Sequence, residues 1–450
     1  MQNQNHQSPA LTTDETSGAQ IDVQARRRKL ETYGWWMVAI ITLGGVINYL
    51  DRSTLSIGNT TIQGQLGFTT IQMGLLLSAF SWPYALANLP GGFLIDRFGP
   101  KKVFLGCIAG WSIVAVLTGF VSSFVSFYIA RVFLGIAEAP FFAAGLKAAQ
   151  YWFNAKDRSM PVSVINTGSQ IGNAIGPPLL TALLVAFSWR TMFIIVGVAG
   201  LVIAILWWFF YRDPSEAEEK IIMSGSEEEN EAETPSKSKH AVREWLSLWK
   251  LPNTWYMTIG CFMIFYTVWV YITWLPGYLE KARGLSLKGT GWAAAVPYIF
   301  GILGVLFGGW ISKRFITRGM KPIVARKIPI VGGAVLSACA VAPIAYVGSF
   351  GLSMVLLCIG YFGAQVPIGC IWTLAADVAD SNQVASLGSI QNFGGFLGAA
   401  VAPIVTSYIL TKTGGSFNLV FVVGAIALIL GAFFYGVMVK DRRTASVAGE

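Results

Sequence analysis

The chain has 450 residues, of which 54% are hydrophobic and only 12% charged. An ordinary soluble protein carries roughly a quarter charged residues, so this composition excludes a typical soluble enzyme or binding domain. Apolar runs of about 20 residues recur along the chain, and each is long enough to cross the hydrocarbon core of a bilayer as a helix. The sequence therefore predicts an all-α polytopic membrane protein.

Twelve membrane spans are predicted. In chain order they cover residues 33–55, 71–94, 103–122, 124–147, 161–186, 191–211, 253–279, 291–312, 328–348, 350–375, 387–411 and 417–439. A polar, acid-rich segment interrupts the series after the sixth span and has the composition of a partly disordered linker. The predicted organisation is therefore an N-terminal tail (1–32), a six-helix bundle (33–211), a linker (212–250), a second six-helix bundle (251–440) and a C-terminal tail (441–450).

The net charge of +9 is distributed unevenly along the chain. Most of the 32 Lys and Arg lie in the tails, the linker and alternate connections, as in "ARRRK" and "DRFGPKK". The opposite connections carry Arg190, Lys281, Arg283, Lys288 and Lys412. Because basic residues favour the cytoplasmic side of a membrane, both tails and the linker are predicted to be cytoplasmic. The basic excess then reflects topology, and no nucleic-acid partner is expected.

Cysteines, histidines and nucleotide motifs offer no sign of enzyme chemistry. The segment before Tyr33 lacks the apolar core and cleavage site of a signal peptide. All five cysteines fall in apolar spans, where small buried hydrophobes are expected rather than disulfides or a metal site. His6 and His240 lie in polar segments, and no phosphate-binding GxxxxGK[ST] motif is present. We therefore predict no metal and no cofactor, and proton chemistry inside the membrane must use carboxylates.

The two halves repeat a short basic connection. "GGFLIDRFGPKK" follows the second span at 91–102, and "GGWISKRFITRGMKP" follows the eighth at 308–322. Two six-span halves with a repeated connection are typical of transporters that bind their substrate between the halves. The two copies differ at one charged position, where the first has Asp96 and the second has Lys313.

These motifs resemble those of a known transporter family. "GGFLIDRFGPKK" is similar to the loop between helices two and three of the major facilitator superfamily. "NYLDRSTLSI", "LLSAFSWPYALANLPGGFLIDRFG", "RVFLGIAEAPFF" and "YWFNAKDRS" resemble its anion:cation symporter family, whose bacterial members take up sugar acids such as galactonate, glucarate and hexuronates. The resemblance covers 33–439 without the linker.

The resemblance carries several expectations about fold and function. It implies twelve helices in two bundles and a monomer in a bacterial inner membrane. It also implies import of an organic anion with protons by alternating access, with the proton gradient as the energy source. The first repeated connection would be a gating loop through Gly91, Asp96, Arg97, Gly99 and Lys101.

A few charged residues lie within the spans, and such residues usually mark transport pathways because they are costly in hydrocarbon. Glu138 lies among small and apolar residues in "RVFLGIAEAPFF" and is predicted to carry a proton across. Arg131, seven residues earlier on the same helix face, is its predicted movable charge partner. The alternative is a permanent pair of Arg131 with Glu138 or Asp51 that ties helices together.

Asp51 and Arg52 point about 100° apart on a helix, so each needs a partner elsewhere. The resemblance implies that Arg52 faces the central cavity and binds the substrate carboxylate, a role that suits its planar two-pronged donor. Asp51 is predicted to be the second protonatable group, with a helix-end cap as the alternative. Just past the tenth span, Asp377 and Asp380 are expected to lie in water.

Neutral polar residues are expected to bind the hydroxyl groups of a sugar acid. The resemblance implies Tyr84, Trp372, Asn392 and a glutamine near position 170, although Ser169 rather than Gln170 occupies that place without a gap. Each of these residues could equally join helices to one another. Lys147 is either a second positive charge in the site or an interfacial lysine whose charge reaches water.

Three functions follow from this reading. The first is import of a sugar acid, and the second is transport or exchange of another small carboxylate such as an aromatic acid, which the tryptophan-rich lining permits. The third is a membrane sensor without transport, which would need a recognisable output domain. Trp274 and Tyr278 are candidates to line the outer mouth of a transporter.

Overall fold

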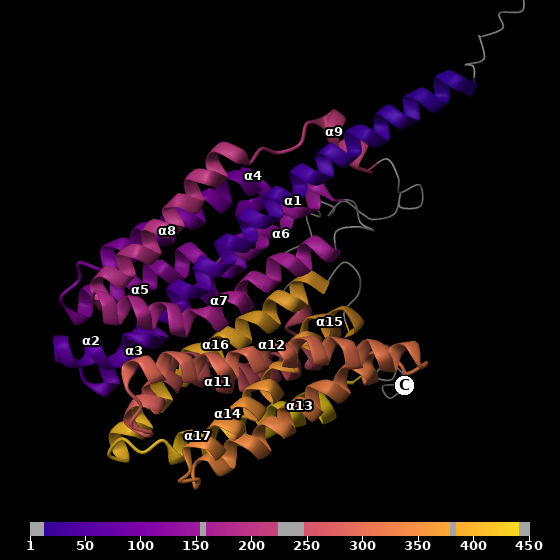
Figure 1. Ribbon diagram of the computed structural model, residues 1–450. Helices are drawn as coiled ribbons and strands as arrows, with labels where there is room; N and C mark the ends of the chain where they lie inside the picture. The colour runs from indigo at the N-terminus through magenta and orange to yellow at the C-terminus, as the bar shows by residue number, and fades with distance from the viewer. Residues whose placement is uncertain (1–12, 154–158, 224–246, 379–383, 441–450) are drawn as a thin grey trace, which may run out of the picture.

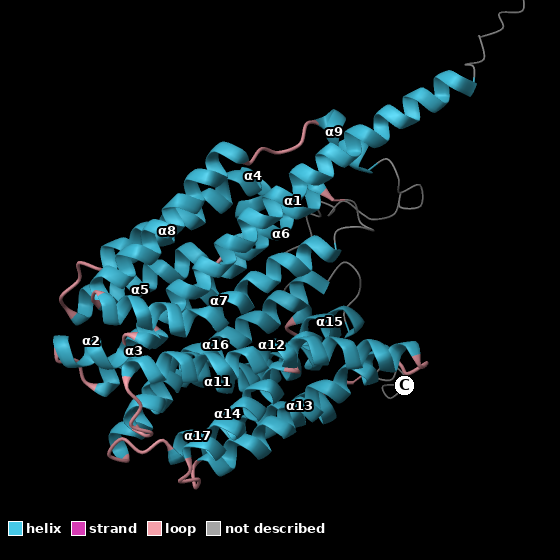
Figure 2. Cartoon of the chain, in the orientation of Figure 1, coloured by secondary structure: helices cyan, strands magenta, loops and turns pink. Residues whose placement is uncertain are grey.

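The structure of the chain is a computed structural model that describes residues 13–153, 159–223, 247–378 and 384–440. In these ranges the regular structure is helical throughout (Figure 2). The first helix begins at Thr13, so much of the predicted N-terminal tail, 1–32, is helical and continuous with the first span. The middle of the predicted linker, the last residues of the chain and both histidines lie outside the described residues.

The helices form two halves that lie one above the other in Figure 1. The N-terminal half contains α1 (Thr13–Ile57), α2 (Asn59–Leu66), α3 (Thr70–Ser78), α4 (Ser81–Thr118), α5 (Phe124–Glu138), α6 (Phe141–Trp152), α7 (Ser159–Ala186), α8 (Trp189–Phe210) and α9 (Glu216–Met223). The C-terminal half contains α11 (Pro252–Lys281), α12 (Leu287–Thr317), α13 (Pro322–Ile344), α14 (Phe350–Gln365), α15 (Ile368–Val378), α16 (Val384–Lys412), α17 (Asn418–Phe433) and the π-helical turn η1 (Phe434–Met438).

Ten helical segments of the described chain are long and apolar enough to cross a membrane. The two predicted spans outside this set, 71–94 and 161–186, are nevertheless helical. The first is covered by α3 and the start of α4, and the second by α7, which carries the polar run "INTGSQIGN". The structure therefore has a helix at each predicted span and confirms the all-α membrane fold.

Several predicted spans are broken rather than continuous. The fourth span is divided into α5 and α6 at Ala139 and Pro140, and the tenth into α14 and α15 at Val366 and Pro367. Proline lacks a backbone N–H and clashes with the preceding helical turn, which accounts for both breaks. Gly99 has φ 78° and ψ 157°, a conformation that favours glycine, and it turns the chain between the second and third spans.

Glycines bring α7 directly against α1. A Cβ on Gly168 would lie 2.4 Å from the carbonyl oxygen of Thr42, and one on Gly172 would lie 2.8 Å from that of Val46. Small residues allow membrane helices to approach this closely, as the spacing of these glycines predicts. The contact fixes the part of α1 that leads to Asp51 and Arg52.

The two halves are joined near the end of the molecule that carries α2. Ser56 donates to the carbonyl oxygen of Thr273 at 3.0 Å, and Lys281 donates to the Gln63 amide oxygen at 2.6 Å. Thr60 also donates to the carboxylate of Glu280.

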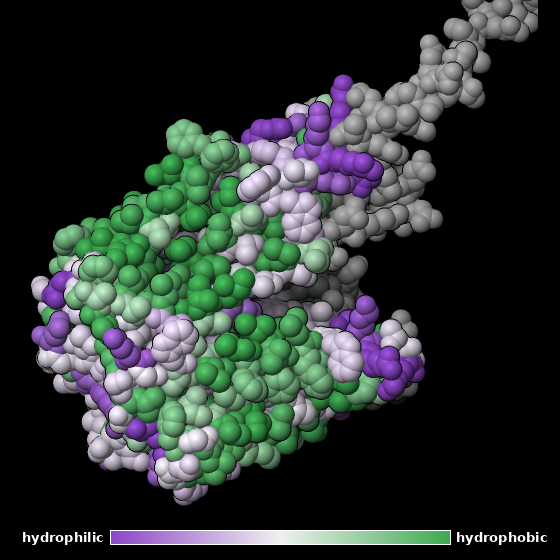
Figure 3. Space-filling model, in the orientation of Figure 1, coloured by the Kyte–Doolittle hydropathy of each residue, from purple (hydrophilic) through white to green (hydrophobic). Residues whose placement is uncertain are grey.

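The halves separate at the opposite end, which carries α15. Figure 3 shows the surface indented between the halves there. Polar and aromatic side chains are exposed on α7 and α15, among them Asn166, Thr167, Trp372 and Thr373. The structure is therefore closed at the α2 end and open at the α15 end.

The beginning of the predicted linker is folded against the N-terminal half. The Arg212 guanidinium donates to both carboxylate oxygens of Glu218 at 2.6 and 2.7 Å and lies over the rings of Tyr33 and Trp152. The hydrogen bonds from Arg212 and Ser215 lower the pKa of Glu218 to about 2. Residues 212–223 are thus ordered, because this ion pair supports the short helix α9.

Closure of the α2 end depends on the small size of Gly74 in α3. A Cβ there would lie 2.1 Å from the hydroxyl of Ser407 in α16. Overpacking of this kind costs about 1–3 kcal/mol, so Gly74→Val should hold the halves apart. In a cysteine-free background, we expect the Gln63→Cys/Lys281→Cys pair to cross-link about tenfold more slowly when Gly74→Val is added.

Gly332→Val is the matched control, because a Cβ on Gly332 has no neighbour within 4 Å. It should leave the cross-linking rate unchanged. Equal rates in the Gly74→Val and control proteins would show that this contact does not govern closure.

Candidate functional site

Four charged side chains meet inside the N-terminal half. The helix α1 supplies Asp51 and Arg52, and α5 supplies Arg131 and Glu138. Their exposed fractions are 1%, 5%, 3% and 0%, respectively. Two acids and two bases in one buried cluster are unusual in a membrane helix bundle, where each ionised side chain is costly.

Arg52 and Glu138 form the ion pair of this cluster. Arg52 Nε donates to Glu138 Oε2 at 2.7 Å. The sequence suggested pairs of Arg131 with Glu138 or Asp51, and these are not the pair observed. Seven residues of helix separate Arg131 from Glu138 by about 10 Å along the axis, whereas Arg52 approaches Glu138 from a neighbouring helix. Arg131 remains close enough to interact electrostatically with both acids.

Asp51 lies inside α1 rather than at its end, since the helix continues to Ile57. The alternative of a helix-end cap is therefore wrong. The Asp51 carboxyl is surrounded by the charges of Glu138, Arg131 and Arg52.

Aromatic rings surround the Arg52 guanidinium. Its central carbon lies 4.7 Å from the ring centroid of Tyr49 and 4.8 Å from those of Phe80 and Tyr84. Such contacts attract a cation to the ring face and strengthen when water is excluded. Tyr84 was predicted, whereas Tyr49 and Phe80 were not. Tyr49 lies three residues before Arg52, a spacing that places both on one helix face and could have revealed it.

The cluster contains more hydrogen-bonding atoms than it uses. Buried polar atoms are nearly always hydrogen-bonded in proteins, so unused atoms in a cluster provide capacity for a ligand, a proton or water. Within the described residues, the buried atoms without a hydrogen-bond partner include both Asp51 carboxylate oxygens, Arg52 Nη2, Arg131 Nε and Nη1, and Glu138 Oε1.

The C-terminal half covers this cluster with an aromatic layer. The ring of Tyr84 lies 4.2 Å from that of Phe396 in α16, and Phe80 stacks on Trp269 of α11 with ring centroids 6.3 Å apart. Trp269 also makes an edge contact with Phe396 at 5.9 Å. The charged cluster therefore borders the interface between the halves.

The other predicted substrate contacts lie on α7, α15 and α16. Trp372 of α15 is 40% exposed, and Asn392 of α16 is half-buried one turn before Phe396. Ser169 is buried and donates to the carbonyl oxygen of Asn166 at 2.7 Å, so its hydroxyl already has a partner within α7. Gln170 is half-buried.

Lys147 and the predicted gating loop lie farther from Arg52. Lys147 is half-buried in α6, and its ammonium lies 5.9 Å from the ring centroid of Tyr151. In the loop, Arg97 is exposed beside the Phe98 ring, and the Lys101 carbonyl accepts from Trp207 Nε1 at 3.0 Å. The Gly91 backbone lies beside Pro140 of the fourth span, while the side chain of Asp96 lies outside the described part.

Two expectations about individual residues need correction. Asp377 pairs with Arg326 and is half-buried, so it does not lie free in water, whereas Asp380 lies outside the described residues. Trp274 and Tyr278, predicted at the outer mouth, are 2% and 3% exposed in this conformation, and their role at the mouth stays a prediction. Cys339 is exposed on α13, unlike the other four cysteines.

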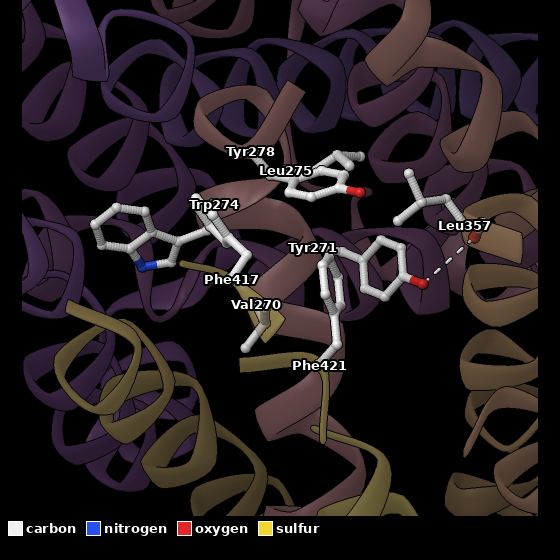
Figure 4. Close-up of a pocket in the computed structure, with 8 residues that line it drawn as sticks. All are labelled: Val270, Tyr271, Trp274, Leu275, Tyr278, Leu357, Phe417 and Phe421. Carbon is white, nitrogen blue, oxygen red and sulfur yellow. Dashed lines mark hydrogen bonds between the residues drawn. The ribbon is translucent and has the colours of Figure 1, made fainter. Parts of the chain in front are cut away.

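Figure 4 shows where Trp274 and Tyr278 lie. With other side chains of α11, α14 and α17 they line a small, almost wholly apolar pocket. The Tyr271 hydroxyl in this pocket donates to the carbonyl oxygen of Leu357 at 3.4 Å. This pocket carries no charge, which separates it from the Arg52 cluster in both place and chemistry.

The Arg52–Glu138 pair should be a strong determinant of stability. Removing one partner of a buried pair leaves an uncompensated charge and costs about 3–5 kcal/mol. We therefore expect Glu138→Ala and Arg52→Ala each to lower the midpoint of thermal unfolding of the purified protein, measured by tryptophan fluorescence. The double variant should be more stable than the sum of the two single losses predicts, because it leaves neither charge unpaired. Additive losses would contradict a direct pair.

Two halves of membrane-spanning helices with buried charges beside their interface define a membrane transporter rather than an enzyme. The comparisons with known proteins agree. The family model of the Major Facilitator Superfamily matches residues 41–403, so the chain belongs to this superfamily of transporters.

Two curated relatives and one solved structure illustrate the similarity. A probable L-galactonate transporter of Escherichia coli (strain K12) is 37% identical over 413 residues, 89% of this chain and 88% of that protein. A probable galactarate/D-glucarate transporter of Bacillus subtilis (strain 168) is 32% identical, over 88% of this chain and 90% of that protein. The fold resembles that of a bacterial homologue of the human lysosomal transporter Spinster in an inward-facing, unoccupied conformation. The TM-score is 0.76 at 19% identity, covering 90% of this chain and 96% of that one.

Proposed function

We propose that this protein imports an organic anion, specifically a sugar acid, together with protons by alternating access. The observation that carries the proposal is the buried Arg52–Glu138 pair, which places an anion-binding side chain in contact with a carboxyl group that can be neutralised by a proton. The relatives named above as carriers of galactonate and glucarate support the choice of a sugar acid.

Competition for Arg52 couples the proton to the substrate. While Glu138 is ionised, it occupies the guanidinium through its 2.7 Å hydrogen bond. A proton on Glu138 removes the charge that Arg52 balances, and the buried cation then needs another anion. A substrate carboxylate meets that need, because the planar guanidinium donates two parallel hydrogen bonds to it. Substrate binding and protonation of Glu138 therefore favour each other.

Asp51 is the second proposed proton carrier. Its two carboxylate oxygens are buried and have no hydrogen-bond partner among the described residues. An ionised carboxylate in that condition is costly, so a proton would stabilise it, and the nearby Arg131 would stabilise its ionised form. Import of two protons with one monoanion would move one net positive charge inward. The membrane potential would then contribute about 2.3 kcal/mol per 100 mV.

The closed and open ends correspond to one stage of the proposed cycle. The distribution of basic residues assigns the α15 end to the cytoplasm, with both chain termini on that side of a bacterial inner membrane. The conformation is then open to the inside. Rocking of the halves would break the contacts of Ser56, Thr60 and Gln63 at the α2 end and open the site to the outside. We propose that a monomer completes this cycle.

A second candidate function is exchange or symport of an aromatic acid. The aromatic layer above Arg52, formed by Phe80, Trp269 and Phe396, is the specific observation that favours it. An aromatic ring stacked on these side chains would gain apolar burial that a hydroxylated chain would not.

Replacing Glu138 by Gln should uncouple transport. The amide keeps the shape of the protonated side chain but cannot release a proton, so Arg52 stays available for substrate. In proteoliposomes, we expect Glu138→Gln to retain counterflow of galactonate and to lose accumulation driven by a pH gradient. Glu219→Gln, which alters an exposed acid of α9, should accumulate galactonate like the unmodified protein. Normal pH-driven accumulation by Glu138→Gln would refute the proton role of Glu138.

Arg52 should determine binding of the carboxylate. Truncating a buried, hydrogen-bonded charge costs about 2–5 kcal/mol, so Arg52→Ala should weaken binding at least about 30-fold. Arg52→Lys keeps the positive charge without the two-pronged donor. Its affinity for the carboxylate should lie between that of Arg52→Ala and that of the unmodified protein. Counterflow of labelled galactonate against galactonate, glucarate, glucuronate and benzoate measures both affinity and specificity. Strong competition by benzoate alone would favour the aromatic-acid alternative.

A further inference from the structure

The α2 end of the molecule carries an excess of positive charge. Its helix ends and connections all lie in the described part of the chain, and they contain one acid, Glu280, and five basic residues, Arg190, Lys281, Arg283, Lys288 and Lys412. Basic residues favour the cytoplasmic side of a membrane, and the α2 end is the opposite side. Topology therefore does not explain these five cations.

Two of the cations lie where the halves meet at this end. Lys281, the last residue of α11, donates to the Gln63 amide oxygen of α2 at 2.6 Å. Lys288 is exposed in the first turn of α12, three residues before Gly291. A Cβ on Gly291 would lie 2.6 Å from Thr181 Oγ1 of α7. Both lysines of the C-terminal half thus stand beside direct contacts with the N-terminal half.

Two further cations lie near the same junction. Arg190 follows Trp189, whose Nε1 donates to the Gln65 side chain of α2 at 2.8 Å. Lys412 is exposed at the end of α16, five residues after Ser407, whose hydroxyl lies against α3. The positive charges are therefore distributed over both halves around the closed end.

No carboxylate balances these charges. Within the described residues, none of the five basic side chains forms an ion pair with an acid. Arg283 donates instead to the carbonyl oxygen of Val347 at 2.7 Å, and Lys281 donates to an amide. The single acid, Glu280, accepts a hydrogen bond from Thr60. Neutral partners do not cancel a charge, so this end keeps a positive field.

Such a field attracts small anions over a longer range than a direct contact. The Debye length is about 8 Å at physiological ionic strength, which is enough for neighbouring surface cations to act together. A surface of one sign can raise the association rate of an oppositely charged ligand about 10- to 1,000-fold.

We propose that the α2 face collects the anionic substrate from outside, and that Lys281 and Lys288 form the place where the anion first binds. The ligand class is a small organic anion such as a sugar acid. This inference rests on the proposed function, because it takes the α2 end as the outer face and an anion as the cargo. When the halves part, Lys281 loses Gln63 and its ammonium becomes free to bind a carboxylate. The anion would then lie at the entrance to the interface that the Arg52 cluster borders.

A reporter cysteine on α2 measures the field at this face. Gly64 is exposed next to Gln63, and a Cβ there would have no neighbour within 4 Å. In a cysteine-free background, Gly64→Cys would be modified by an anionic and by a cationic methanethiosulfonate. The ratio of the two rate constants would be divided by the same ratio for free cysteine. We expect this normalised ratio to exceed one by at least about threefold at about 10 mM salt. It should approach one at about 1 M salt, where the Debye length is about 3 Å.

Charge variants assign the field to the two lysines. Lys288→Glu and Lys281→Gln should each lower the normalised ratio at least about twofold at low salt, because each removes positive charge beside the reporter. Lys281→Arg keeps the charge and should preserve the ratio. Lys250→Glu is the matched control, because Lys250 is exposed just before the opposite end of α11, and it should leave the ratio unchanged.

Uptake shows whether the transporter uses this field. In right-side-out membrane vesicles, galactonate uptake far below saturation should fall about threefold in Lys288→Glu at about 10 mM salt and should be normal at about 1 M salt. Each rate is divided by that of the unmodified protein at the same salt concentration, which cancels general effects of salt. The maximal rate should not change, because Lys288→Glu leaves the contact of Lys281 with Gln63 in place. Lys250→Glu should take up galactonate normally at both salt concentrations.

Two outcomes would overturn the inference while leaving the proposed function intact. The first is a normalised ratio near one at low salt, and the second is normal galactonate uptake by Lys288→Glu at both salt concentrations. Failure of the unmodified protein to transport any organic anion would instead refute the proposed function, and the reporter ratio would still measure the field on its own.

Discussion

The ion pair between Arg52 and Glu138 is the interaction on which the rest of this structure depends. Both side chains are almost completely buried, at 5% and 0% exposure, and either one alone would be an uncompensated charge inside the membrane. Three aromatic rings and the neighbouring charges of Asp51 and Arg131 surround the pair. The ion pair exists only while Glu138 is ionised, because a proton on Glu138 neutralises one of its two charges. The proposed cycle requires a buried contact that forms and breaks in this way.

The two halves contribute different chemistry to the same interface. The N-terminal half supplies the charges through α1 and α5, whereas the C-terminal half supplies aromatic rings from Trp269 and Phe396. The matching breaks of the fourth and tenth spans indicate that both halves share one backbone plan. Glu138 ends α5 and Gln365 ends α14, so the first copy carries an acid where the second carries an amide.

Much of the fold was predictable from composition and spacing. Long apolar runs predict helical spans because backbone groups in a bilayer must be satisfied within each span. The glycines of α7 indicated close helix packing, and the structure shows that the neighbour is α1. Arg52 and Glu138 stood out as charges in apolar surroundings. The pairing of Arg52 with Glu138 did not stand out, because spacing along one helix suggested Arg131 as the partner of Glu138. Phe80 could not be recognised either, since one aromatic residue among many carries no sign of what it touches.

From the sequence alone one can establish the class of fold, the number of halves and the short set of buried charges, because each depends on local hydropathy and on the cost of a charge in hydrocarbon. Which charges meet, where the spans break and which end is open were decided by tertiary structure. Contacts between α1 and α5, or between Tyr84 and Phe396, join residues that are far apart along the chain. Such contacts depend on how helices pack against one another, and no periodicity within a single helix contains that information.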